Sequence, residues 1–98
     1  MSFSIAILPS ALSDIQDAID YYDEQQIGIS QKFESELNLL FLSLQKNPFY
    51  QLRYKTVHCL PLKKFPFMIH FTVDEKTSII YVRAILHTSL NPDDYWLK

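Results

Sequence analysis

The feature that most constrains the fold is an apolar stretch near the C-terminal end of the chain, residues 78–87. Its even positions from 80 to 86 are all apolar, and three of the four odd positions from 79 to 85 carry isoleucine or tyrosine. A strand with two apolar faces is covered on both sides in a folded protein. We therefore predict an interior strand over 78–87, followed by a polar turn at Asn91-Pro92 and an aromatic end at Tyr95 and Trp96.

Two earlier stretches repeat apolar residues at helical spacing. The first follows Pro9, with Ser10 expected as its N-cap, and the second runs from about residue 29 to Lys46, just before another proline. Gly28, the only glycine, is expected in a left-handed conformation at the C′ position between the two helices. The short connection predicts an antiparallel helical hairpin.

Alternation with a period of two predicts three further strands, over 2–7, 53–60 and 67–73. The order is β-α-α-β-β-β, and the 98 residues suffice for one domain over 1–98. We predict an α+β fold, with the helical hairpin packed on a small, mostly antiparallel four-stranded sheet. The pattern does not decide which strand neighbours the N-terminal one.

The formal net charge of −2 argues against broad attraction to nucleic acid, because phosphate binding normally needs a cationic surplus. We therefore expect no stable DNA binding by this chain alone. The single cysteine, Cys59, provides neither a disulfide framework nor a Cys-based metal site. Residues 1–8 lack a basic n-region and form only a short apolar run, which favours a cytoplasmic protein without a signal peptide or membrane span.

Three histidines, His58, His70 and His87, fall on three separate predicted strands without metal-ligand spacing, so we expect no metal site and no cofactor. His87 ends the interior strand beside a polar turn. There it could act as a general acid or base, because the pKa of histidine is tunable near neutrality. The alternative, which we favour, is a histidine that bonds to the backbone of the turn.

The local basic patch consists of Arg53, Lys55, Lys63 and Lys64, with aromatic residues between them. This mixture suits phosphate contact and base stacking, and equally suits a solvated edge strand. Arg83, on the interior strand, is expected to need an anionic or carbonyl partner.

Four aspartates on the first helix, at positions 14, 17, 20 and 23, do not form a calcium loop. We read them as a solvated face, with Asp14 near the positive end of the helix dipole. On the second helix, Leu39 and Leu42 widen the apolar arc beyond one stripe. This helix is therefore expected to pack on two sides or to offer an apolar patch to a partner.

The element order resembles that of the ParE/RelE superfamily of toxins from bacterial type II toxin–antitoxin modules, and is most similar to the ParE-like branch. The likeness is carried by residues 14–22, 46–48, 62–71 and 82–92, and by the ending at Trp96. The resemblance implies a toxin of a plasmid-stabilisation type of module. A cognate antitoxin, whose C-terminal segment wraps the toxin, would hold it inactive.

ParE-type members poison DNA gyrase, whereas RelE-type members are ribosome-dependent mRNA endonucleases that use Arg and Lys around the sheet and a C-terminal Tyr. Here residues 88–90 contain no cation, although Tyr95 matches the position of the RelE tyrosine. We therefore predict a gyrase-binding toxin that is not itself an enzyme. The alternatives are an endonuclease that uses the basic patch, His87 and Tyr95, and an attenuated toxin that only binds antitoxin.

One departure from the family concerns the turn after the interior strand. ParE-like relatives carry His-x-x-Arg-x-Pro there, and this chain has His87-Thr88-Ser89-Leu90-Asn91-Pro92. Leu90 lacks the charge and the donor fork of arginine, so any target contact that depends on the arginine is lost. The leucine fits a natural drift to weak toxicity, an attenuating change selected during cloning, or an arginine that this member never used. The residues expected to bind the target are Arg83, His87, Leu90, Asn91 and Trp96.

Overall fold

In a computed structural model of the chain, the structure describes residues 2–49, 52–54 and 56–88. Two helices and five strands follow one another along this part of the chain. In order they are β1 (Ser4–Ile7), α1 (Pro9–Gln25), α2 (Ile29–Lys46), β2 (Leu52–Tyr54), β3 (Val57–Pro61), β4 (Phe67–Asp74) and β5 (Ile79–His87).

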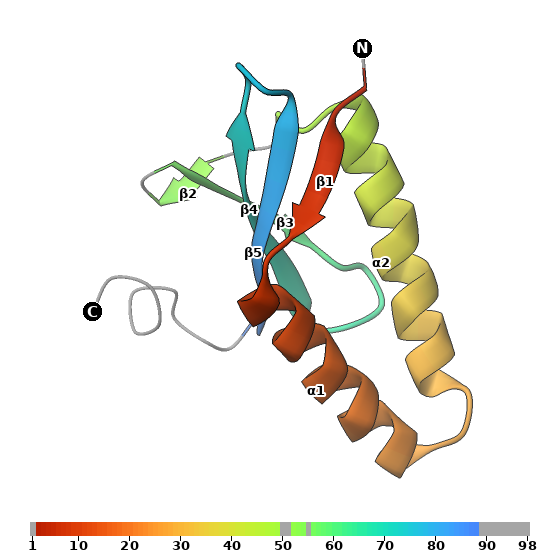
Figure 1. The fold of residues 1–98 in the computed structure, drawn as a ribbon. Coiled ribbons are helices and arrows are strands. Elements are labelled where there is room, and N and C mark those ends of the chain that lie inside the picture. Colours follow the sequence, from red (N-terminus) through yellow and green to blue (C-terminus); the bar gives the residue numbers. More distant parts are fainter. Residues whose placement is uncertain (1, 50–51, 55, 89–98) are drawn as a thin grey trace.

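The strands form one sheet in the order β1-β5-β4-β3-β2 (Figure 1). β1 runs parallel to β5, and the other three neighbouring pairs are antiparallel. The interior position predicted for residues 78–87 is therefore confirmed, since β5 lies between β1 and β4. The structure also identifies the neighbour of the N-terminal strand, which the sequence pattern did not decide.

The prediction of a single strand over 53–60 was wrong. β2 and β3 pair antiparallel with each other, so the chain reverses between Tyr54 and Val57 and the sheet gains a short fifth strand. The residues at the reversal, Tyr54-Lys55-Thr56-Val57, include no glycine, proline, asparagine or aspartate, which are the residue types that usually mark a turn. A period of two shows where side chains alternate but does not show where a strand turns back.

The helical hairpin forms as expected, with α2 running antiparallel to α1 on one side of the sheet (Figure 1). Gly28 has a φ of 93°, the predicted left-handed conformation, but it is the N-cap of α2 because α1 already ends at Gln25. The prediction of Ser10 as N-cap was also wrong. Leu8 is the N-cap of α1 and Pro9 is its first residue, a position where the missing N–H of proline is harmless.

The core lies between the hairpin and the sheet. From α2 it takes Phe33, Leu37 and Leu44, all buried, and from the sheet it takes buried side chains of β3, β4 and β5. Phe33 contacts three other rings, those of Tyr22, Phe65 and Phe67, at centroid distances of 5.7, 5.4 and 5.5 Å. The rings of Phe65 and Phe67 contact Phe33 in an edge geometry and that of Tyr22 is tilted, and aromatic contacts of this kind add to the stabilisation from apolar burial.

β5 contains a β-bulge at Arg83. His70 pairs with Ala84 and Phe71 pairs with Val82, so Arg83 has no residue opposite it on β4. The additional residue changes the parity of the strand, which lets both Val82 and Ile85 face the core. The bulge therefore accommodates an arginine within an otherwise apolar interior strand.

Candidate functional site

Beyond the end of β1, helix α1 provides the hydrogen-bonding partners of β5. The N–H of Leu8 donates to the carbonyl oxygen of Val82 at 3.0 Å, and the Ser10 hydroxyl donates to the carbonyl oxygen of Arg83 at 2.7 Å. Further along, the N–H of Ile85 donates to Oδ2 of Asp14 at 3.1 Å. Backbone groups of an interior strand need partners on both sides, and the backbone N–H of the N-cap Leu8 and two side chains of α1 supply them here.

The sequence pattern placed Asp14 on a solvated helix face near the positive end of the helix dipole. That prediction was wrong, because Asp14 bonds to β5 and lies beyond the first turn of α1. Partial burial raises the pKa of its carboxyl group, the hydrogen bond from Ile85 opposes this effect, and the nearby Asp17 adds to it. Asp23 is also engaged, because it accepts a hydrogen bond from the hydroxyl of Ser30 on α2. Asp17 and Asp20 are exposed, as predicted.

The end of β5 is attached to the loop that precedes β4. The N–H of Thr88 donates to the carbonyl oxygen of Pro66 at 2.9 Å, and the His87 ring lies edge-on to Phe67 at 5.4 Å. Arg83, the other described member of the predicted target-binding set, donates from Nε to the Thr72 hydroxyl at 2.9 Å. Its described partner is thus a hydroxyl rather than the carboxylate or carbonyl that was expected.

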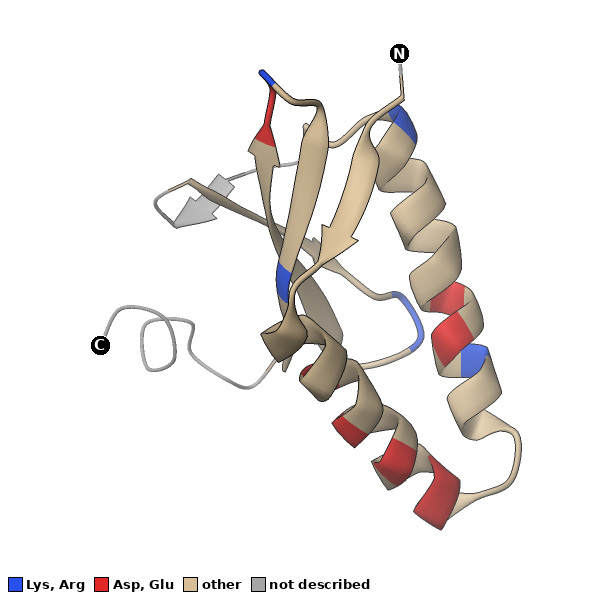
Figure 2. Cartoon of the chain, viewed as in Figure 1, with Lys and Arg blue, Asp and Glu red and all other residues tan. Residues whose placement is uncertain are grey.

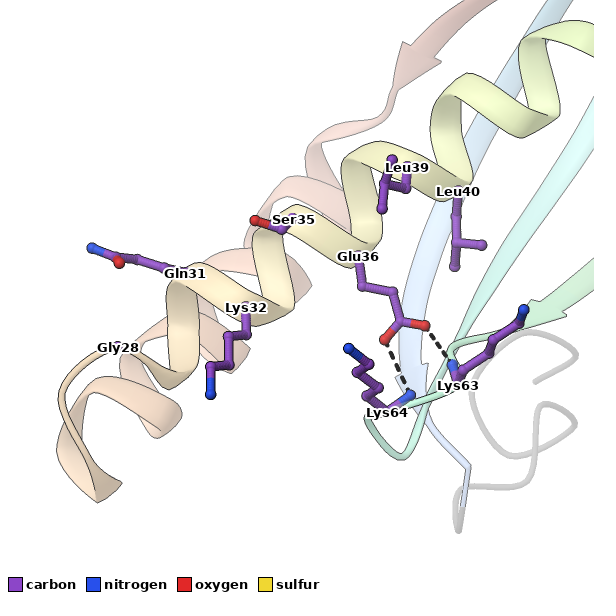
Figure 3. A pocket seen from close by; sticks show the side chains of 9 residues that line it. All are labelled: Gly28, Gln31, Lys32, Ser35, Glu36, Leu39, Leu40, Lys63 and Lys64. Carbon is purple, nitrogen blue, oxygen red and sulfur yellow. Dashed lines mark hydrogen bonds between the residues drawn. The ribbon is translucent and has the colours of Figure 1, made fainter.

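The same loop, residues 62–66, is held to α2 by Glu36. The Glu36 carboxylate accepts hydrogen bonds from the backbone N–H groups of Lys63 at 2.5 Å and Lys64 at 3.1 Å (Figure 3). A carboxylate with two N–H donors forms charge-assisted hydrogen bonds, which are stronger than neutral ones. Loop 62–66 therefore connects α2 with the end of β5.

A groove with a volume of about 670 Å³ lies between α2 and this loop (Figure 3). Leu39 and Leu40 contribute apolar surface to it, and Lys32, Lys63 and Lys64 contribute three ammonium groups, against one carboxylate from Glu36. Its other lining residues are Gly28, Gln31 and Ser35. The sequence reading identified Lys63 and Lys64 as basic residues but did not connect Lys32 and Glu36 with them. Lys32, Glu36 and Leu40 are spaced by four residues, which places them on one side of α2.

The histidines have separate environments. His58 stacks on Phe71 at 5.3 Å, and Nδ1 of the buried His70 lies 3.3 Å from Sγ of Cys59. Within residues 2–49, 52–54 and 56–88, no three His, Cys, Asp or Glu side chains gather in a way that could hold a metal ion. In the same ranges, neither helix is long and apolar enough to cross a membrane.

Several predicted site residues lie outside the described residues. They are Lys55, Leu90, Asn91, Tyr95 and Trp96, and the side chain of Arg53 belongs with them. Their roles remain predictions from the sequence and from the family resemblance.

The architecture is that of a small α+β domain, with a helical hairpin on a mixed sheet whose interior strand pairs with the N-terminal strand. No protein-family model matches the sequence, and no curated protein matches it. Among solved structures, a chain of the chromosomal ParDE TA system from P. aeruginosa matches with a TM-score of 0.73 at 21% identity. The match covers 88% of this chain and 96% of that one.

A chain of the toxin–antitoxin complex RelBE2 from Mycobacterium tuberculosis matches with a TM-score of 0.63 at 10% identity, over 89% of this chain and 99% of that one. The fold is therefore the ParE/RelE-like fold. The resemblance recognised in the sequence is confirmed at the level of the fold, as is the predicted α+β class.

Proposed function

We propose that this chain is the toxin component of a type II toxin–antitoxin module and that a cognate antitoxin neutralises it. The observation that carries the proposal is the extent of the shared fold. Chains from two toxin–antitoxin systems superpose on it over 96% and 99% of their own lengths. The same matches cover 88% and 89% of this chain, so the shared fold accounts for most of it, although fold alone does not determine function.

For the target we propose DNA gyrase, which the toxin binds and poisons in the cytoplasm. The support is the likeness of residues 82–92, apart from Leu90, to the ParE-like branch, and the lack at residues 88–90 of the cation that an RNA-cleaving site would use. Cleavage of RNA needs a base, an acid and cations around one phosphate. A chain that acts by binding gyrase needs none of these groups.

A second candidate is a ribosome-dependent mRNA endonuclease using Arg53, Lys55, Lys63, Lys64, His87 and Tyr95. One observation favours it: the hydrogen bond between Thr88 and Pro66 attaches the strand end that carries His87 to the loop that carries Lys63 and Lys64. The strand that carries the histidine and the loop that carries the two lysines therefore lie next to each other.

The deciding experiment is colony formation after induction of the chain without antitoxin, alongside a Leu90→Arg variant, with a DNA-damage reporter in the same cells. Gyrase poisoning predicts that Leu90→Arg stops growth and activates the reporter. Growth arrest with a silent reporter and cleaved messages would support the endonuclease instead. If both chains are harmless yet bind the antitoxin, the chain is an attenuated toxin that only titrates its antitoxin.

A further inference from the structure

The groove between α2 and loop 62–66 differs in charge from the rest of the molecule. Its lining carries three lysines and one glutamate, hence two net positive charges, whereas the chain as a whole carries −2. Figure 2 shows acidic residues along α1 and blue residues where the loop approaches α2. An acidic ligand is therefore repelled by much of the surface and attracted to this groove.

The carboxylate in the groove is already engaged. Both oxygens of Glu36 accept backbone N–H groups of the loop, so they hold the walls together. Lys32, Lys63 and Lys64 are exposed, and their long side chains leave the ammonium groups accessible to a ligand. A loop wall held by backbone hydrogen bonds and three accessible ammonium groups suit a ligand that carries carboxylates.

The groove also offers an apolar contact. Leu39 lines it and is 66% exposed, although it belongs to a helix whose other apolar face is buried in the core. An exposed leucine beside cations fits a ligand that has both carboxylates and an apolar side chain. Phosphate groups alone would leave this leucine uncovered.

We propose that the groove receives an acidic segment of the antitoxin. Its carboxylates face Lys32, Lys63 and Lys64, and an apolar side chain covers Leu39. The inference rests on the proposed function, because it specifies the chemistry of the partner that the toxin assignment requires. Loop 62–66 also contacts the end of β5 through Pro66 and Thr88, so the bound segment lies against the loop that positions the predicted target-binding turn.

The test measures the affinity of the purified chain for the protein encoded by the neighbouring reading frame. Lys63→Gln combined with Lys64→Gln is expected to weaken binding by about tenfold, and Leu39→Ser by a similar factor of about ten. The matched controls are Lys46→Gln and Leu12→Ser. They change an exposed lysine of α2 and a 54% exposed leucine of α1, both outside the groove, and are expected to leave the affinity unchanged.

Each outcome distinguishes the two proposals. If the unmodified chain does not bind the neighbouring protein, the toxin assignment fails. If it binds but the groove variants bind as tightly as the controls, the toxin assignment survives and the groove inference is overturned. Tighter binding of a short RNA oligonucleotide that depends on Lys63 and Lys64 but not on Leu39 would also overturn it. Thermal unfolding of every variant verifies that the fold is retained.

Discussion

The carboxylate of Asp14 in α1 accepts a hydrogen bond from the backbone N–H of Ile85 in β5, 71 positions further along the sequence, at 3.1 Å. β1 stops pairing with β5 at Val82, so β1 offers no acceptor to the N–H of Ile85, and the Asp14 carboxylate serves as its acceptor instead. The Asp14 side chain thereby replaces the backbone acceptor that a neighbouring strand would provide, and it attaches the helical hairpin to the end of β5. The predicted target-binding turn begins two residues beyond Ile85, at His87.

Replacing Asp14 tests this role. Ile85 is buried, so Asp14→Ala leaves a buried N–H without its acceptor and is expected to destabilise the fold by about 1–3 kcal/mol. Asp14→Asn retains an oxygen acceptor and should lose much less. Urea unfolding gives the free energies, with the exposed Glu24→Ala as the control. Equal losses for the alanine and asparagine variants would contradict the hydrogen-bonding role.

The pKa of Asp14 gives a prediction for pH. Partial burial raises this pKa above its ordinary value of 3.8, so the folded chain takes up the proton before the unfolded chain does. Protonation of Asp14 therefore adds to the free energy of unfolding as the pH falls from the folded-state pKa towards 3.8. This added stability is lost as the pH rises through the folded-state pKa. The wild-type chain should gain stability relative to Asp14→Asn in this window. Unfolding curves across the window measure the difference, and a constant or opposite trend would show that the pKa is not raised.

Glu36 is expected to control the order of loop 62–66. Glu36→Ala removes the acceptor of two backbone N–H groups and should destabilise the fold by about 1–2 kcal/mol. Amide hydrogen exchange at Lys63 and Lys64 should become faster, because these are the donors that lose their partner. Glu34→Ala, an exposed change on the same helix, should leave both amides as they were. Unchanged exchange in Glu36→Ala would mean that the loop is held by other contacts.

Gly28 isolates the effect of backbone conformation. A β-carbon added there meets no atom within 4 Å, so Gly28→Ala introduces strain at a φ of 93° without a steric clash elsewhere. We expect a loss of about 1 kcal/mol in the free energy of unfolding, and a smaller loss for Gly28→Asn, which tolerates left-handed backbone better. Thermal and urea unfolding of the two variants provide the comparison. An alanine variant as stable as the wild type would show that the connection between the helices relaxes to another conformation.

Much of the fold could be predicted because its signals are local. Residues 29–46 repeat apolar side chains at helical spacing and end before a proline, and they form α2 with those bounds. The two apolar faces of residues 79–87 predicted an interior strand, and β5 is one. Each of these patterns is complete within one segment and needs no knowledge of the neighbours.

The candidate site was predicted only in part. Lys63 and Lys64 were recognised as part of a basic patch and Leu39 as part of a wide apolar arc, but the groove combines them with Lys32, which lies 31 positions before Lys63. The sequence reading placed Glu36 only in the helix and did not anticipate the two hydrogen bonds that close the groove. A charge pattern shows which residues are solvated but not which distant backbone groups they meet.

By itself, the sequence determined the two helices, the interior strand and the likeness to a toxin family, because periodicity and composition are properties of contiguous residues. Only the tertiary structure decided that residues 52–61 form two strands, that Arg83 occupies a bulge, and that Asp14 bonds to Ile85. These features depend on hydrogen bonds between groups far apart in the chain. Their partners are fixed by the packing of the hairpin on the sheet, and no local pattern specifies that packing.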